Sequence, residues 1–239
     1  MGQELVETPV LALQAQRTHG FLDDAYGAED FMTSVATDSG VTTVTDAAGG
    51  VISLAASDGT VADNDEIYRH TISETFKFAV GKPIEFYCRA QYTEANTDDA
   101  NVYIGLMDAM DANALVDNGA GPKTTASAAG FFKVDGGTNW NVIYSDSTTQ
   151  VKVELTAANS LDGLAKTAGG SAYQVFEIKV LPLGSRLDVL FFINGVHVYT
   201  IADRTFANAT EMDAGLGIKN GGANLETLNY DLIYCYQTR

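Results

Sequence analysis

The stretch that decides the fold reads Leu187-Asp-Val-Leu-Phe-Phe-Ile, then Asn194-Gly195, then Val196-His-Val-Tyr-Thr-Ile. Two runs of β-branched and aromatic residues flank the Asn-Gly pair, and such runs favour strands. Asn and Gly both tolerate the positive φ angles of a type I′ turn, which joins the two strands of a tight hairpin. The stretch therefore predicts a β-hairpin that turns at Asn194 and Gly195.

Similar strand-like runs occur along the chain from Phe21 onward. Residues 84–92 alternate, so that Phe86 and Cys88 share one face while Glu85 and Tyr87 share the other. A second hairpin is predicted to turn at Asp135-Gly136-Gly137. Further strands are expected at residues 41–45, 51–54, 75–80, 101–107, 173–181, 214–219 and 228–236. Roughly a dozen short strands with almost no helical periodicity predict an all-β sandwich of two antiparallel sheets.

The chain of 239 residues contains no obvious linker and no repeat of fixed period. We expect a single domain over residues 20–239, because β sandwiches of this length commonly form one domain. Residues 1–19 are interpreted as an N-terminal arm, with a frayed terminus as the alternative. The apolar residues and proline of this arm are the predicted partner-binding residues: Leu5, Val6, Pro9, Val10, Leu11 and Leu13.

The charge balance excludes some classes of partner. There are 31 acidic and 14 basic side chains, which gives a net charge of −17. Proteins that bind nucleic acid or anionic membranes use clustered Lys and Arg, so neither partner is expected. No stretch approaches the roughly 18 apolar residues of a membrane span, and the N-terminus lacks the pattern of a signal peptide.

Two stretches interrupt the strand pattern, at residues 108–129 and 146–170. Both are rich in small and polar residues, apart from a short apolar run at residues 151–155. Loops of this length inside a compact domain are usually functional or mobile.

The sequence predicts no catalytic residue, no metal-binding residue and no cofactor. The motifs GxSxG, HExxH, GxGxxG and the P-loop are all missing, and the three histidines are scattered. Cys88 and Cys235 are interpreted as buried thiols, although a single disulfide between them stays open.

Acidic clusters and aromatic residues leave other kinds of site open. Solvated surface acid is the preferred interpretation of the acidic clusters, with calcium bound by Asp63, Asp65 and Asp98 as an alternative. No Glu-x-Asp-x-Glu strand of the kind found in glycosidase sandwiches is present. Trp140 is the one strong candidate for a platform on which a sugar ring could stack, and core packing explains it equally well.

The C-terminal half resembles concanavalin A-like (laminin-G-like) jelly rolls. The resemblance is carried by Phe176-Glu-Ile-Lys-Val, Asp188-Val-Leu-Phe-Phe-Ile-Asn-Gly-Val-His-Val-Tyr, Gly215-Leu-Gly-Ile and Leu228-Asn-Tyr-Asp-Leu-Ile-Tyr. It implies a jelly-roll sandwich over residues 20–239. It implies no particular activity, because this fold is used by lectins, hydrolases and structural modules.

A narrower resemblance is to structural proteins of tailed-bacteriophage virions. It is carried by Asp63-Asn-Asp-Glu-Ile-Tyr-Arg-His-Thr, Glu74-Thr-Phe-Lys-Phe-Ala-Val-Gly-Lys-Pro, Tyr92-Thr-Glu-Ala-Asn-Thr-Asp-Asp-Ala and Phe131-Phe-Lys-Val-Asp-Gly-Gly-Thr-Asn-Trp. The resemblance implies a non-enzymatic capsid decoration protein, bound to the major capsid protein on the virion head after assembly in the host cytoplasm. A homo-oligomer is expected, with a trimer favoured over a dimer.

Two other functions are kept as alternatives. The first is a carbohydrate-binding module or lectin-like adhesin, which would bind a glycan through aromatic and polar residues. The second is a glycan hydrolase, which requires two carboxyl groups about 5–9.5 Å apart across a groove.

Overall fold

The computed structural model describes residues 18–23, 32–37, 41–45, 50–57, 59–94, 99–117, 119, 121–170, 172–206 and 210–238. Over these ranges there is no helix, and so none that is long and apolar enough to cross a membrane. The six predicted arm residues, Leu5, Val6, Pro9, Val10, Leu11 and Leu13, lie outside the described residues.

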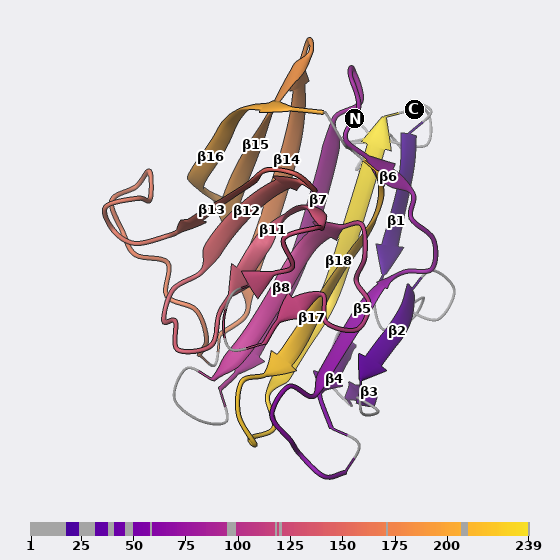
Figure 1. The fold of residues 1–239 in the computed structure, drawn as a ribbon, viewed down its shortest axis with the longest axis vertical. Helices are drawn as coiled ribbons and strands as arrows, with labels where there is room; N and C mark the ends of the chain where they lie inside the picture. Colours follow the sequence, from indigo (N-terminus) through magenta and orange to yellow (C-terminus); the bar gives the residue numbers. More distant parts are fainter. Residues whose placement is uncertain are drawn as a thin grey trace, which may run out of the picture.

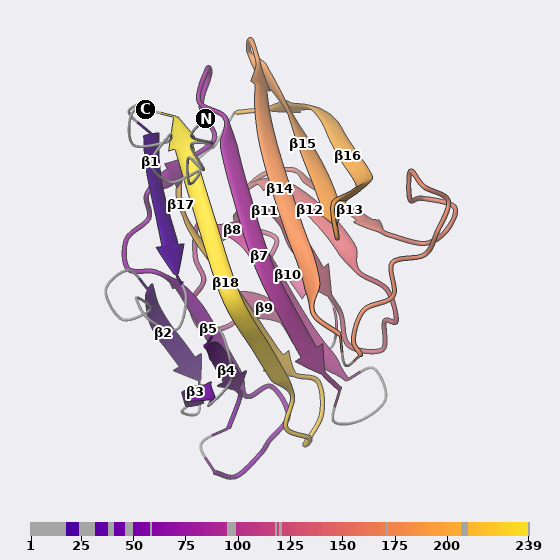
Figure 2. The same cartoon turned by 180° about the vertical axis from the view of Figure 1, so that it is seen from behind.

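The described strands form two large antiparallel sheets packed face to face (Figures 1 and 2). In spatial order, sheet A contains β16 (Val196–Thr205), β15 (Arg186–Ile193), β14 (Gln174–Leu183), β7 (Ile84–Thr93), β18 (Thr227–Thr238), β4 (Val51–Ala55) and β3 (Val41–Thr45), and β1 (Thr18–Asp23) also pairs with β18. Sheet B contains β13 (Gln150–Glu154), β12 (Asn141–Asp146), β11 (Ser127–Lys133), β8 (Ala100–Met107), β17 (Glu211–Asn220), β5 (Glu66–Thr71) and β2 (Met32–Thr37), and β6 (Phe76–Lys77) also pairs with β17. The predicted all-β sandwich is confirmed.

Both predicted hairpins are confirmed. Asn194 and Gly195 have φ angles of 52° and 75°, the positive values of a type I′ turn, and Ile193 pairs with Val196 across the turn. The second hairpin joins β11 to β12, and Gly136 has a φ of 71° between them.

Two parts of sheet B differ from the sequence prediction. The acidic stretch from Asp63 turns at Asn64 and then continues directly into β5, a buried strand that the strand-like runs did not indicate. Conversely, the strand expected at residues 75–80 is only the two-residue β6. At the end of β6 the Gln237 side-chain oxygen accepts a hydrogen bond from the Lys77 amide at 3.1 Å.

The core lies between the two sheets and contains Trp140. This side chain is 1% exposed, and its ring lies edge-on to Phe176 at 4.9 Å and to Tyr92 at 5.6 Å. Its Nε1 donates a hydrogen bond to the Gln174 side chain at 2.9 Å, which satisfies its one polar atom. Trp140 is therefore a core residue, and its interpretation as a sugar platform is wrong.

Cys88 and Cys235 lie on neighbouring strands β7 and β18, and both are buried free thiols. Burial raises the pKa of Cys235, so the thiol stays protonated and acts as a small apolar group. The predicted pair of buried thiols is confirmed, and the two residues form no disulfide.

Candidate functional site

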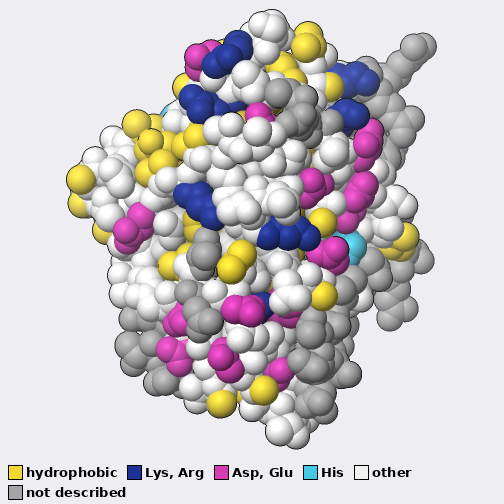
Figure 3. Space-filling model, in the orientation of Figure 1, with side chains coloured by type: hydrophobic (Ala, Val, Ile, Leu, Met, Phe, Trp, Pro, Cys, Tyr) yellow, Lys and Arg dark blue, Asp and Glu magenta, His cyan; other side chains and the backbone are white. Residues whose placement is uncertain are grey.

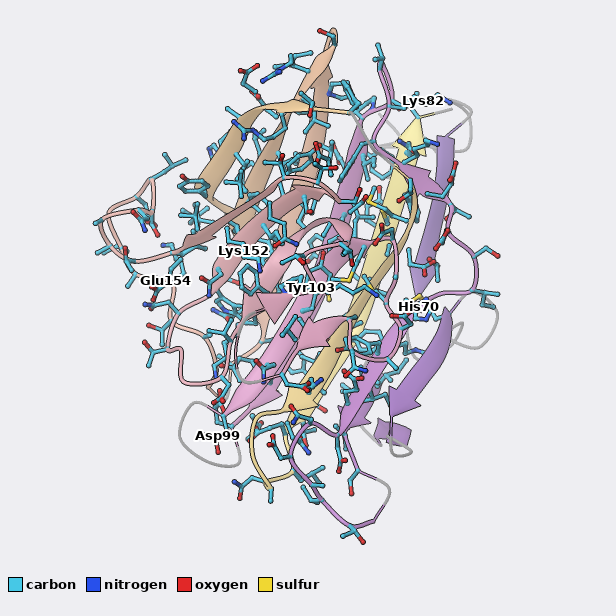
Figure 4. The ribbon with its side chains drawn as sticks, in the orientation of Figure 1. His70, Lys82, Asp99, Tyr103, Lys152 and Glu154 are labelled. Carbon is cyan, nitrogen blue, oxygen red and sulfur yellow. The ribbon has the colours of Figure 1, made fainter. Side chains whose placement is uncertain are left out.

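A long segment between β8 and β11 covers the outer face of sheet B. We name residues 108–126, apart from 118 and 120, the covering segment; it contains the short strands β9 (Leu115–Val116) and β10 (Gly121–Pro122). Met110 and Leu115 of this segment pack on Tyr68, Tyr103 and other buried residues of the sheet. Figure 4 labels Tyr103 near the middle of the sheet. The interrupted stretch is thus a packed structural element.

A buried polar cluster of Glu66, Tyr68 and Lys219 holds the covering segment. The Tyr68 hydroxyl donates to Glu66 Oε2 at 2.7 Å and accepts from the Leu115 amide at 3.0 Å. Lys219 is fully buried; its Nζ lies 3.5 Å from Glu66 Oε2, donates to the Leu115 carbonyl at 3.2 Å and pairs with Asp117. Burial and the Glu66 charge both raise the pKa of Tyr68, which keeps its hydroxyl available as a donor.

Glycine allows the aromatic rings to lie flat on sheet B beneath the segment. A Cβ atom at Gly130 would lie 2.5 Å from the ring and hydroxyl of Tyr103, which is closer than side chains tolerate. A Cβ at Gly217 would also overlap the ring of Tyr68, its direct partner across β17 and β5. The outer face of sheet B around Tyr68 and Tyr103 is therefore filled by the protein's own side chains.

The outer face of sheet A has a different character. In β7, the residues Phe86, Cys88 and Ala90 are buried in the core, so the alternating Glu85 and Tyr87 point outward, as the sequence predicts. Figure 2 shows this sheet from its outer side, with β14, β7 and β18 side by side.

The strand register aligns partly exposed side chains into rows across this face. Tyr87 pairs with Glu177 of β14 on one side and with Tyr234 of β18 on the other, and Glu177 in turn pairs with Phe192 of β15. One row is therefore Phe192, Glu177, Tyr87 and Tyr234. The neighbouring row contains Lys179, Glu85 and Tyr236 by the same register. We name these seven residues the tyrosine face.

Aromatic rings contact other side chains at both ends of the tyrosine face. The rings of Tyr234 and Tyr236 lie 5.3 Å apart. At the other end, His197 stacks on Phe192 at 4.8 Å, and the Lys179 ammonium lies 5.6 Å from the centre of the Phe192 ring. His197 thus extends the aromatic surface beside Phe192.

Partial burial and neighbouring carboxylates raise the pKa values of phenols on the tyrosine face. Partial burial and the carboxylate of Glu177 raise the pKa of Tyr87, and partial burial and the carboxylate of Glu85 raise that of Tyr234. The face therefore presents aromatic rings, hydroxyl groups, two carboxylates and one ammonium group side by side.

Of the acidic residues proposed as calcium ligands, Asp65 is engaged within its own turn. Asp65 is buried, and its Oδ2 accepts a hydrogen bond from the Ala62 amide at 2.8 Å, which fixes the turn before β5. Asp98 lies outside the described residues. Among the residues that the structure describes, no three His, Cys, Asp or Glu side chains gather in a way that could hold a metal ion.

Comparison with known proteins identifies the fold through solved structures only. No family model matches the sequence, and no curated protein matches it. The Emp47p carbohydrate recognition domain matches with a TM-score of 0.56 and 11% identity over 92% of this chain and 95% of its own. Basic winged bean lectin matches with a TM-score of 0.55 and 12% identity over 92% and 98%.

An enzyme has the same architecture. The endo-1,3-beta-glucanase of Streptomyces sioyaensis matches with a TM-score of 0.55 and 13% identity over 92% of this chain and 97% of its own. The fold is thus a concanavalin A-like jelly roll, as the sequence resemblance implies. At these identities the matches establish the fold but not the activity, since lectins and a hydrolase share this fold.

Proposed function

We propose that this protein is a lectin-like glycan-binding protein that holds an oligosaccharide on the tyrosine face. The observation that carries the proposal is the cross-strand row of Phe192, Glu177, Tyr87 and Tyr234, all partly exposed. Aromatic rings offer flat apolar surfaces to the faces of sugar rings, and neighbouring charged groups hydrogen-bond hydroxyl groups. The fold shared with lectins supports the proposal.

The length of the row favours an oligosaccharide over a single sugar. From β15 to β18 the row crosses three inter-strand spacings, which amounts to roughly 14 Å. One pyranose ring would cover only part of this distance. A linear chain lying across the strands would contact Phe192 at one end and Tyr234 at the other.

Binding without hydrolysis is the second part of the proposal. Glu66, a carboxylate of sheet B's outer face, lies under the covering segment and is engaged by Tyr68 and Lys219. A hydrolase needs two carboxyl groups facing a substrate groove. Glu66 is therefore covered and engaged, which favours binding at the tyrosine face over hydrolysis at Glu66.

A glycan array followed by titration of the best ligand tests the proposal. We expect Tyr234→Ala and Tyr87→Ala each to raise the Kd about five- to tenfold, because each removes one stacking surface. Tyr234→Phe keeps the ring and should retain most of the affinity.

Leu164→Ala serves as the control, because Leu164 is an exposed residue of the loop after β13 and lies outside the tyrosine face. The proposal fails if the array shows no ligand, or if folded Tyr87→Ala and Tyr234→Ala proteins bind the ligand as tightly as the unchanged chain does.

Capsid decoration is a second candidate, which rests on the sequence resemblance to phage head proteins. Nothing in the comparisons indicates a phage protein. The test is co-sedimentation of the purified chain with undecorated capsids, with and without a chelator. Saturable pelleting that survives chelation would support decoration through protein contacts, and absence of pelleting would remove this candidate.

A further inference from the structure

A cavity of about 180 Å³ lies at one edge of the sandwich, where β12 of sheet B approaches β16 of sheet A. Tyr144 and Asp146 of β12 form one side of the cavity, and Arg186 of β15 and Arg204 of β16 form the other. Two of the four arginines in the described ranges therefore line one cavity, in a chain with a net charge of −17.

The two carboxylates in the cavity wall are already engaged. Asp146 Oδ1 accepts hydrogen bonds from the amides of Thr148 and Thr149 at 3.1 and 2.7 Å, and its Oδ2 accepts one from the Thr205 hydroxyl at 3.0 Å. Asp203 Oδ1 accepts a hydrogen bond from Arg186 Nε at 2.7 Å. Both acids thus have hydrogen-bond partners other than Arg204.

Arg204 is the cation with donors to spare. Its Nε donates to the Ala202 carbonyl at 2.8 Å, and across the described part of the chain no carboxylate forms an ion pair with it. In the described part of the chain its two terminal nitrogens have no hydrogen-bond acceptor, and Arg204 lines the cavity. Both arginines also act on Tyr144. Burial and Asp146 raise the pKa of the Tyr144 hydroxyl, and the positive charges of Arg204 and Arg186 oppose this rise.

We propose that this cavity binds a carboxylate group, with Arg204 as its main partner. A guanidinium presents two parallel N–H donors that match the two oxygens of a carboxylate, and such charge-assisted pairs are stronger than neutral hydrogen bonds. The volume suits a small group rather than a large ligand. The carboxylate comes from an acidic sugar or from a small free acid, and the cavity is separate from the tyrosine face.

Titration calorimetry of the full chain with glucuronate, acetate and glucose tests the proposal. We expect saturable binding of at least one carboxylate and none of neutral glucose. Stronger binding of glucuronate than of acetate would identify an acidic sugar as the source, and equal binding would identify the free acid group alone. Saturation by glucose, or no saturation by either carboxylate, overturns the proposal.

Two substitutions locate the site. Arg204→Gln should weaken carboxylate binding about tenfold or more, because a charge-assisted hydrogen bond is lost. Arg204→Lys keeps the positive charge but lacks the two parallel N–H donors of a guanidinium. Its affinity for carboxylate should lie between those of Arg204→Gln and the unchanged chain. Lys123→Gln removes one positive charge from the covering segment and should leave binding unchanged.

Thermal denaturation identifies which variants are folded. If Arg204→Gln does not fold, Arg204→Lys alone decides the question, since its affinity must then lie below that of the unchanged chain. Full affinity in a folded Arg204 variant overturns the assignment to this residue.

Discussion

At the scale of single residues, Asp146 is a carboxylate fixed by its immediate neighbours. Burial by itself would raise the pKa of Asp146, but hydrogen bonds from the Thr149 and Thr148 amides and from the Thr205 hydroxyl outweigh burial. The pKa of Asp146 is therefore lower than that of an ordinary aspartate. A carboxyl group with a lowered pKa stabilises the folded state when ionised, and this contribution is lost as the pH falls through the folded-state pKa.

Replacing Asp146 by Asn is expected to lower the free energy of unfolding by about 1–2 kcal/mol at neutral pH, because charged acceptors form stronger hydrogen bonds than neutral ones. The difference should be complete above the pKa of an unfolded aspartate and should be lost as the pH falls through the lower folded-state pKa of Asp146. Urea unfolding of both proteins over this pH range measures it. A difference that stays constant down to the lowest pH would show that the charge of Asp146 is not responsible.

The sequence could predict the outward direction of some side chains but not their alignment. Alternation in residues 84–92 is sufficient to place Glu85 and Tyr87 on one face. The row with Glu177 and Tyr234 depends on the pairing of β7 with two strands that are far away in the chain, and a shift of one residue would turn Tyr234 into the core. Trp140 was ambiguous for a similar reason, since only the packed sheets decide its burial.

At the scale of elements, the covering segment is packed on sheet B although its composition is that of a loop. Its few large residues and its glycines interrupt the strand pattern, so the sequence indicates a loop. Besides apolar packing and Tyr68, the segment is held on sheet B by a lysine and a glutamate, residue types that are usually exposed. Lys219 and Glu66 are buried only because the segment covers them.

We predict that Lys219→Met destabilises the protein by about 3–5 kcal/mol, since it leaves Glu66 buried without its positive partner. The double variant Lys219→Met/Glu66→Gln should recover much of the loss, because the uncompensated charge is then removed. Urea unfolding measures both effects. Hydrogen exchange at residues 109–117 should be faster in the single variant than in the double variant.

A matched control for this prediction is Lys123→Gln. Lys123 forms an ion pair of 2.9 Å with Asp111 in the same segment, but Asp111 is largely exposed. Such surface pairs contribute about 0–1 kcal/mol. Similar losses in Lys219→Met and Lys123→Gln would contradict a role for burial in the polar cluster.

At the scale of the whole molecule, the net charge is large and negative, because acidic side chains outnumber basic ones by 31 to 14. On the sheet B side, most Lys and Arg side chains lie in the upper half and the middle, whereas acidic side chains are spread over both halves (Figure 3). A net charge of −17 on a chain of 25.4 kDa causes repulsion within the folded state.

Added salt should therefore stabilise this protein. The Debye length falls from about 30 Å at 0.01 M ionic strength to about 8 Å at 0.15 M, so repulsion between distant acidic groups is screened. We expect a higher Tm at the higher sodium chloride concentration in differential scanning calorimetry. An unchanged or lower Tm would mean that attractive ion pairs outweigh the repulsion.

The fold class and both hairpins were predictable because they depend on local signals, the alternation of residues and the Asn194-Gly195 turn. The buried strand β5 was not, because a strand buried on both faces does not alternate: five of its six residues are buried, two of them the charged Glu66 and Arg69. The candidate sites on sheet A and at Arg204 were missed for the same kind of reason. Both bring together residues that are distant in the chain.

The pairing of β1 with β18 has a mechanical consequence. Thr18 lies opposite Thr238 and Asp23 opposite Ile233, so the free ends of both strands point the same way. A force that draws Thr18 and Thr238 apart acts on the pair at one end of this ladder. It would therefore break the hydrogen bonds one residue pair at a time instead of loading all of them together. Pulled from these ends, the jelly roll yields first by peeling off β1 at low force.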